Sequence, residues 1–467
     1  MKRKFLISLL SVLSAFCLTF GFAACEKDNG KGSTDGGKNK PGGPPSLVLP
    51  GDDADTLLAY ETKTEILTDE NGEPVKDEEG NNVIDKYVVI TGIGTETKTA
   101  ITIPATVDEK PVKKIAVDAF RGKTDITAVS FSEGLEEIGN GAFTNCSSIT
   151  ALTFPNSLTT VGTNAFLNCA ALSAVNIGSG LKVISDSMFQ NCTSLTSITV
   201  PANVTAINEN AFFSCTSLRN VEVGSGVTTI GPYAFKSCTS LKVLDMTGAT
   251  SLATLGNNVF QGAGLEKIIF PNSVRYIGTN LLTGCYSIDY ISVPFLGRER
   301  LMEPYGDNDD EKPNYTHFSY LFGAAGPEDN NSKLGELNGK SITVRVTDVT
   351  DEAPICYGAF WNTKGIGTII IEGTMTKLRT GALYSASLEQ EINVVLPESI
   401  EVIDINASGG TRFKALYFMG NQEMWLSSVT IRSENMITKS LTTYYYSEKA
   451  EAGCWHYVDG KPTVWNN

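Results

Sequence analysis

Cysteine is the residue whose spacing in this chain first raises a question of chemistry. Five of the ten cysteines recur at a constant interval of 23 residues. They are Cys146, Cys169, Cys192, Cys215 and Cys238. A thiol can act as a nucleophile, bind a metal or form a disulfide, and each role requires particular partners. What lies beside the cysteines therefore decides what they do.

The cysteines are part of a longer sequence repeat. Residues 194–216 (SLTSITVPANVTAINENAFFSCT) and 217–239 (SLRNVEVGSGVTTIGPYAFKSCT) share one apolar template that ends in A-F-x-x-C. In the first copy, Leu195, Ile198 and Val200 would face inward and Thr199 outward, as in a strand with one buried face. Pro201 has no amide to donate, so the strand should end there.

Phenylalanine keeps the same interval as cysteine until the last step, which is two residues longer. The series is Phe120, Phe143, Phe166, Phe189, Phe212, Phe235 and Phe260. A period in the low twenties with a leucine-rich strand is typical of a leucine-rich repeat solenoid. We predict a mainly β solenoid with coils of about 23 residues, short parallel strands, little helix and small β caps at both ends.

In such a stack the thiols lack the partners that reactive chemistry needs. A nucleophile requires a nearby base, but the only histidines, His317 and His456, lie far from the cysteine series along the chain. Residues repeated once per coil spread along a line, whereas zinc needs four converging ligands. Parallel Cβ vectors also give poor disulfide geometry. We therefore predict reduced, buried thiols that pack as small hydrophobic side chains.

The repeat resembles the BspA-type leucine-rich repeat proteins of bacterial cell surfaces. The resemblance rests on SLTSITVPANVTAINENAFFSC and its copies, and it covers nearly all of Tyr87 to Trp465. It implies a secreted or surface-anchored, right-handed solenoid used for adhesion or for other protein and glycan contacts. It brings no catalytic residues and no cofactor to carry over.

The N-terminus predicts export and anchoring. The basic stretch MKRK precedes an apolar run that ends in GFAAC, and GFAAC resembles a bacterial lipobox. We expect Cys25 to carry the lipid, with residues 1–24 as signal peptide and 25–50 as a flexible Gly/Pro/Lys tether. An uncleaved membrane helix is the alternative. The expected location is extracytoplasmic, lipid-anchored to a bacterial membrane and surface-exposed.

Changes of pattern divide the remaining chain. The predicted segments are an N-terminal β cap (51–100), a first repeat block (101–295), an irregular insertion (296–340), a degenerate second block (341–425) and a C-terminal aromatic cap (426–467). The acidic DNDDE run in the insertion lacks the alternating ligands and the central Gly of a calcium loop, so a solvated loop is expected. Trp455, His456, Tyr457 and Trp465 should seal the last coil, and a sugar-stacking platform is the alternative.

The outward strand positions form the expected binding face. The early coils present only small side chains, including Ala128, Ala151 and Ala174, which we interpret as spacer. Larger polar and aromatic residues follow in the later coils and are the predicted ligand-binding residues. They are Arg219, Glu222, Lys242, Asp245, Lys267 and Tyr290. An ordinary solvated face is the alternative interpretation.

Charge and motif content limit the function. The chain has 37 Lys and Arg against 52 Asp and Glu, a net charge of −15, which disfavours nucleic-acid binding. The regular coils contain no base, metal cluster or phosphate loop, so an enzyme would need its site in the insertion or the cap. We expect a non-catalytic surface protein that binds a protein or glycan outside the cell. A structural envelope component that binds peptidoglycan or polysaccharide is the alternative.

Overall fold

The computed structural model describes residues 58–94, 99–299, 317–324, 337, 339–361, 363–386 and 390–465. Cys25, the tether and the DNDDE run lie outside these residues. Within the described ranges, no helix is long and apolar enough to cross a membrane.

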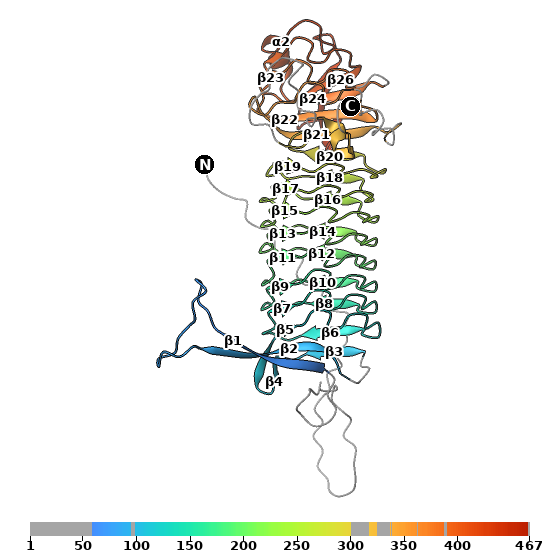
Figure 1. Ribbon diagram of the computed structural model, residues 1–467. Helices are drawn as coiled ribbons and strands as arrows, with labels where there is room; N and C mark the ends of the chain where they lie inside the picture. Colours follow the sequence, from blue (N-terminus) through green and yellow to red (C-terminus); the bar gives the residue numbers. More distant parts are fainter. Residues whose placement is uncertain are drawn as a thin grey trace, which may run out of the picture. The chain divides into compact units, whose positions relative to one another are not determined.

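The repeat folds as predicted, into stacked coils with short parallel strands (Figure 1). Each coil has three sides. A short strand forms the first side, and residues one repeat apart pair in parallel register, as Ser197 does with Asn220 and Thr199 with Glu222. The first-side strands of the regular coils are β3 (Ala100–Ile103), β6 (Ala128–Phe131), β8 (Ala151–Thr153), β10 (Ala174–Asn176), β12 (Ser197–Thr199), β14 (Asn220–Glu222), β16 (Val243–Asp245), β18 (Lys267–Ile269) and β20 (Tyr290–Val293).

The second side carries another parallel ladder, mostly of two-residue strands. Its members are β5 (Lys110–Ile115), β7 (Glu137–Ile138), β9 (Thr160–Val161), β11 (Val183–Ile184), β13 (Ala206–Ile207), β15 (Thr229–Ile230), β17 (Thr254–Leu255) and β19 (Tyr276–Ile277). In the first repeat copy quoted above, Ala206 and Ile207 form β13. Both sides bind the next coil through backbone hydrogen bonds, and the third side does so as well, since the amide of Phe212 donates to the carbonyl of Ala234 at 2.8 Å.

The inward and outward positions of the strands follow the predicted alternation. Leu195, Ile198 and Val200 are buried, whereas Thr199 is exposed. The strand β12 ends before Pro201, as expected for a residue without an amide hydrogen.

The third side holds the phenylalanine column. The ring of Phe212 stacks between those of Phe189 and Phe235, with centroids 5.5 and 5.2 Å apart. Cys215 is completely buried beside this column, and its thiol donates to the carbonyl of Phe189 at 3.2 Å. Cys146, Cys169, Cys192 and Cys238 repeat the same bond to a phenylalanine carbonyl. The described cysteines form no disulfide, so the predicted buried thiol column is confirmed.

These thiols should react slowly in the native protein. Burial raises the pKa of Cys192 to about 12 and also raises the pKa of Cys215. Because the thiolate is the reactive form, a thiol reagent should label both residues only after unfolding. Mass spectrometry of native and denatured samples measures this, with the partly exposed Cys454 as the site expected to react first. Rapid native labelling of Cys215 would contradict the packing role.

The N-terminal end begins with an antiparallel hairpin of β1 (Leu58–Ile66) and β2 (Ile84–Ile93). The strand β2 also pairs in parallel with β5, so the hairpin covers the first strand of the second-side ladder. A short strand, β4 (Thr106–Val107), pairs antiparallel with β5. Both strands of the hairpin lie within the segment for which we predicted an N-terminal β cap.

The described part of the irregular insertion completes a coil. Glu299 bridges Tyr276 at the end of the second-side ladder. The 3-10 helix η2 (Phe318–Phe322) lies on the third side, where the amide of Leu282 donates to the carbonyl of Leu321 at 2.7 Å. Phe318 then packs on Phe360 with ring centroids 6.1 Å apart. The insertion thus supplies a coil that differs in sequence from the others.

The coils continue after the insertion with longer first-side strands, which join β16, β18 and β20 in one sheet of ten strands. They are β21 (Ile342–Val349), β22 (Ile366–Gly373), β24 (Ile392–Leu396), β26 (Phe413–Phe418) and β28 (Thr443–Tyr446), with β23 (Lys377–Leu378), β25 (Val402–Ile403) and β27 (Thr430–Ile431) on the second side. A short helix, α2 (Gln422–Ser427), precedes β27. The chain ends in β29 (Cys454–Val458), parallel to β28, and β30 (Lys461–Val464), antiparallel to β29.

Candidate binding face

The predicted binding residues before β20 share one exposed face of the first-side strands. Arg219 and Lys242 directly precede β14 and β16, and Glu222 and Asp245 end the same strands. All four side chains are exposed, and Val243 between them is 54% exposed. The stacking of the coils therefore brings residues from separate repeats into two columns. Arg219 and Lys242 lie at the start of their strands, and Glu222 and Asp245 lie at the end.

Short polar contacts hold this face in place. Glu222 accepts a hydrogen bond from the Thr199 hydroxyl at 3.0 Å. Lys242 pairs with Glu266 in the next coil at 3.3 Å. Asp245 accepts from the amide and the hydroxyl of Thr247, at 2.9 and 2.8 Å. Each of these groups is still open to solvent, so the face can offer charges of both signs to a ligand.

Tyr290 does not belong to the exposed face, and its prediction as a ligand-contacting ring is wrong. The residue is only 2% exposed. The turn between β29 and β30 lies on it, since a Cβ atom on Gly460 would approach the ring to 3.0 Å. Lys267 is half-buried, with its Nζ 4.9 Å from the centroid of the Tyr290 ring. Lys267 therefore marks the end of the open face.

The C-terminal hairpin β29–β30 covers the outward side of the later strands. Trp455 is fully buried there and donates from Nε1 to the carbonyl of Phe418 at 3.1 Å. It packs in a second apolar cluster with Ile370, Val395, Ala415 and Tyr417. The aromatic segment is a cap, and Trp455 is too buried to serve as a sugar platform. The aromatic segment follows the last coil and also covers the outward face of the sheet.

The sequence did not predict a polar cluster beneath this hairpin. Arg345 in β21 donates from Nε and Nη2 to Glu372 in β22, at 2.9 and 2.7 Å. The Tyr457 hydroxyl donates to the other oxygen of Glu372 at 2.8 Å. Burial, together with the charge of Glu372, raises the pKa of Tyr457, so the hydroxyl stays protonated at neutral pH. The repeat period could not reveal this cluster because Arg345 follows the insertion and Tyr457 returns from the C-terminus.

Two open hollows lie along the first-side face. One, of ≈ 480 Å³, is lined by polar residues such as Thr247, Asn272, Thr347, Arg345 and Glu372. The other, of ≈ 690 Å³, lies over the small side chains of β6, β8 and β10. The early coils, which we interpreted as a flat spacer, are therefore hollowed. Small outward residues leave this space because nothing projects from the strands.

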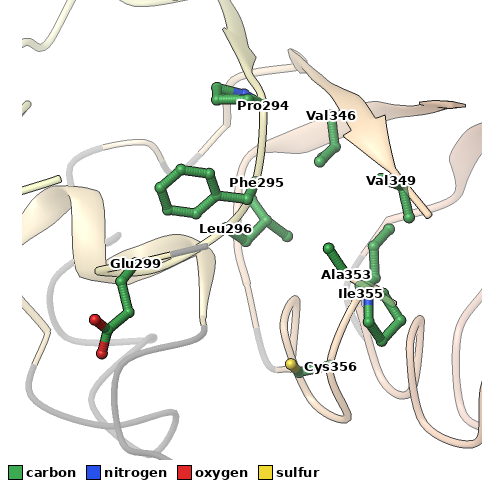
Figure 2. Close-up of a pocket in the computed structure, with 10 residues that line it drawn as sticks. Pro294, Phe295, Leu296, Glu299, Val346, Val349, Ala353, Ile355 and Cys356 are labelled. Atoms are coloured by element: carbon green, nitrogen blue, oxygen red, sulfur yellow. The ribbon is translucent and has the colours of Figure 1, made fainter. Parts of the chain in front are cut away.

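The described residues hold no arrangement typical of a reaction centre. No group of three or more His, Cys, Asp and Glu side chains among them could hold a metal ion. Cys356 and Glu299 line one pocket together with apolar residues such as Phe295 and Val346 (Figure 2). Its volume is ≈ 20 Å³, little more than the space of one water molecule, so it is a packing gap between the segment that follows β20 and the end of β21.

A comparison with protein-family models identifies the repeat. Residues 113–242 and 205–297 match the model of the BspA type leucine-rich repeat region, in six copies. A solved leucine-rich repeat protein from Bacteroides ovatus is 18% identical, with 82% of this chain and 99% of that chain covered and a TM-score of 0.37. No curated protein matches the chain.

Two further solved structures are similar. A leucine-rich cell surface protein from Faecalibacterium prausnitzii is 18% identical, with 78% of this chain and 98% of that chain covered and a TM-score of 0.36. The T. pallidum leucine-rich repeat protein is 25% identical, with 46% of this chain and 87% of that chain covered and a TM-score of 0.32.

Proposed function

The chain carries a BspA-type leucine-rich repeat region, and from this premise we propose that it is a non-catalytic binding protein of the bacterial surface. Its ligand is a protein or a glycan outside the cell. The contact surface is the open first-side face from β12 to β18, with Arg219, Glu222, Lys242, Asp245 and Lys267 as contact residues.

One observation carries this proposal. The outward face of β12 to β18 is open to solvent, whereas the equivalent face from β20 onward is covered by the C-terminal hairpin. A protein that covers part of a sheet face with its own chain and leaves charged residues on the rest keeps a defined surface for contact. Large side chains that converge on such a surface supply the few anchors that usually dominate binding.

In this proposal the protein acts outside the cytoplasm and is held at the membrane by a lipid on Cys25. That position follows from the leader and the lipobox-like GFAAC sequence. Incorporation of labelled palmitate into the wild type, but not into Cys25→Ala, is the test. An unlabelled wild type would remove the lipid anchor from the proposal and leave the binding face unaffected.

An array of matrix proteins and purified cell-wall glycans, probed with residues 26–467, should identify the ligand class. Replacing Arg219, Lys242 and Lys267 together by Ala should then weaken binding at least about tenfold, or roughly 1.4 kcal/mol. The control replaces Ser130, Thr153 and Asn176 by Ala, on the exposed face of the earlier strands β6, β8 and β10, and should have a much smaller effect. Both variants must keep the wild-type melting profile.

Two outcomes would change the proposed binding face or the proposed role. If the control variant loses as much affinity as the test variant, the ligand does not favour β12 to β18. Binding of cell-wall glycans only would favour the structural envelope role over adhesion.

A further inference from the structure

The N-terminal hairpin carries a second contact surface, distinct from the strand face. We propose that the free edge of β1 docks an extended segment of a partner protein, in which basic residues lie opposite Glu61 and Glu65. The segment would add a strand to the sheet beside β1. This mode of recognition combines backbone hydrogen bonds for affinity with side-chain pairs for selectivity.

The hairpin is fixed at its base and exposed beyond it. Leu58, Val88 and Ile90 are completely buried in the core. The Lys113 ammonium on β5 contacts Asp85 of β2 at 2.6 Å and lies 5.9 Å from the centroid of the Tyr87 ring. Figure 1 shows β1 and the loops after it leading away from the stacked coils. The edge is therefore presented in a defined direction.

The outer edge of β1 has no partner strand among the described residues. The strand order of its sheet begins at β1, which pairs only with β2. At its end, the amide of Leu67 donates to the carbonyl of Val83 at 2.9 Å. Because hydrogen-bonded pairs alternate along an antiparallel ladder, Thr62 and Thr64 direct their backbone groups away from β2. Such an edge can accept another strand.

Apolar side chains gather where this edge ends. Ile66, Leu67, Val75 and Ile84 are 50%, 41%, 37% and 53% exposed. Backbone bonds join the segments that carry them, from Leu67 to Val83 at 2.9 Å, from Val75 to Leu67 at 2.8 Å and from Val83 to Val75 at 2.9 Å. The apolar group is thus held in place, and grouped exposed apolar residues mark contact surfaces.

Charge decides which strand fits the edge. Glu61, Lys63 and Glu65 alternate along one face of β1, and residues 58–93 contain nine acidic residues against three lysines, a net charge of −6. A second copy centred on Lys63 would place this lysine opposite itself and Glu61 opposite Glu65, which destabilises the pair. A copy centred on Thr62 would pair Lys63 with Glu61 but would leave Glu65 opposite Ala59, so it satisfies only part of the pattern. The Lys63–Glu61 ion pair at 2.9 Å is about half exposed, so it exchanges partners at little cost. The fitting strand carries basic, acidic and basic residues at alternate positions.

The synthetic peptide VKTETKV has this complementary pattern and serves as the probe. Its control, VETKTEV, repeats the charge order of β1 itself. Fluorescence anisotropy with the purified protein should show that VKTETKV binds at least about tenfold more tightly than the control. Replacing Glu61, Lys63 and Glu65 together by Lys, Glu and Lys should reverse this preference. The Lys182→Ala variant, at an exposed position directly before β11 on the second side, should bind both peptides as the wild type does.

A second variant tests the backbone contribution. Thr64→Pro removes one edge amide and leaves every charge in place, so it should weaken VKTETKV binding at least about tenfold. Equal binding of both peptides to the wild type, or no reversal in the charge-swapped variant, would overturn the proposal. Tighter binding of VETKTEV, with a dimer seen by light scattering, would replace the partner protein by a second copy of the chain.

Discussion

Phe212→Ala should destabilise the folded chain by about 3 to 5 kcal/mol. Phe212 is completely buried, and its ring lies between those of Phe189 and Phe235. Removing it leaves a void in a column to which each coil supplies one side chain, and neighbouring coils cannot close the void without breaking their own backbone pairing. Urea unfolding followed by circular dichroism measures the loss.

Two further variants calibrate this result. Cys215→Ala lies in the same coil but removes only a small buried group, so it should cost about 1 kcal/mol. Thr199→Ala is on the exposed face and should change stability by less than about 0.5 kcal/mol. A Phe212→Ala variant as stable as Thr199→Ala would mean that the aromatic column does not hold the coils together.

Trp455→Ala should have the second large effect. It should lower the free energy that holds the C-terminal hairpin against the sheet by about 3 to 5 kcal/mol. Trp455 is completely buried against Tyr417, with ring centroids 5.6 Å apart, and its indole donates to the Phe418 carbonyl. Without it, β29 and β30 should lose protection against hydrogen exchange and expose the outward face of β22 to β28. Exchange measured by mass spectrometry resolves these segments from β12 to β18.

The control for this variant is His456→Ala in the same strand. His456 is only partly buried and stacks on Trp465 at 3.6 Å, outside the second apolar cluster. It should leave the exchange of β22 to β28 unchanged. If Trp455→Ala also leaves that exchange unchanged, the hairpin is held by other contacts and the boundary of the open face needs another explanation.

The regular coils could be predicted because each strand residue contacts the equivalent residue of the next repeat. Each residue of β12 pairs with the residue 23 positions later in β14, so the interval between Cys192 and Cys215 already contains the register. The same logic gave the inward positions of Leu195 and Ile198 and the burial of the thiols. Four of the six contact residues predicted from the sequence are exposed for this reason, and Lys267 is half-buried.

The period could not predict contacts that skip many coils. Tyr290 occupies a regular outward position, but Gly460 from the C-terminal hairpin lies on its ring. The Arg345–Glu372–Tyr457 cluster joins β21 and β22 to the same C-terminal hairpin. Phe318 replaces the usual third-side phenylalanine within a segment whose sequence breaks the repeat. In each case a tertiary contact, rather than the repeat, decides what is buried.

Site-specific photo-crosslinking tests the binding face most directly. A photoreactive residue at Asn220, on the exposed face of β14, is compared with one at Thr205, an exposed position beside β13 on the second side. With the ligand identified by the array, the account predicts crosslinks from position 220 and none above background from position 205. Equal crosslinking from both positions, or crosslinking from position 205 alone, would contradict a binding surface on the first-side strands.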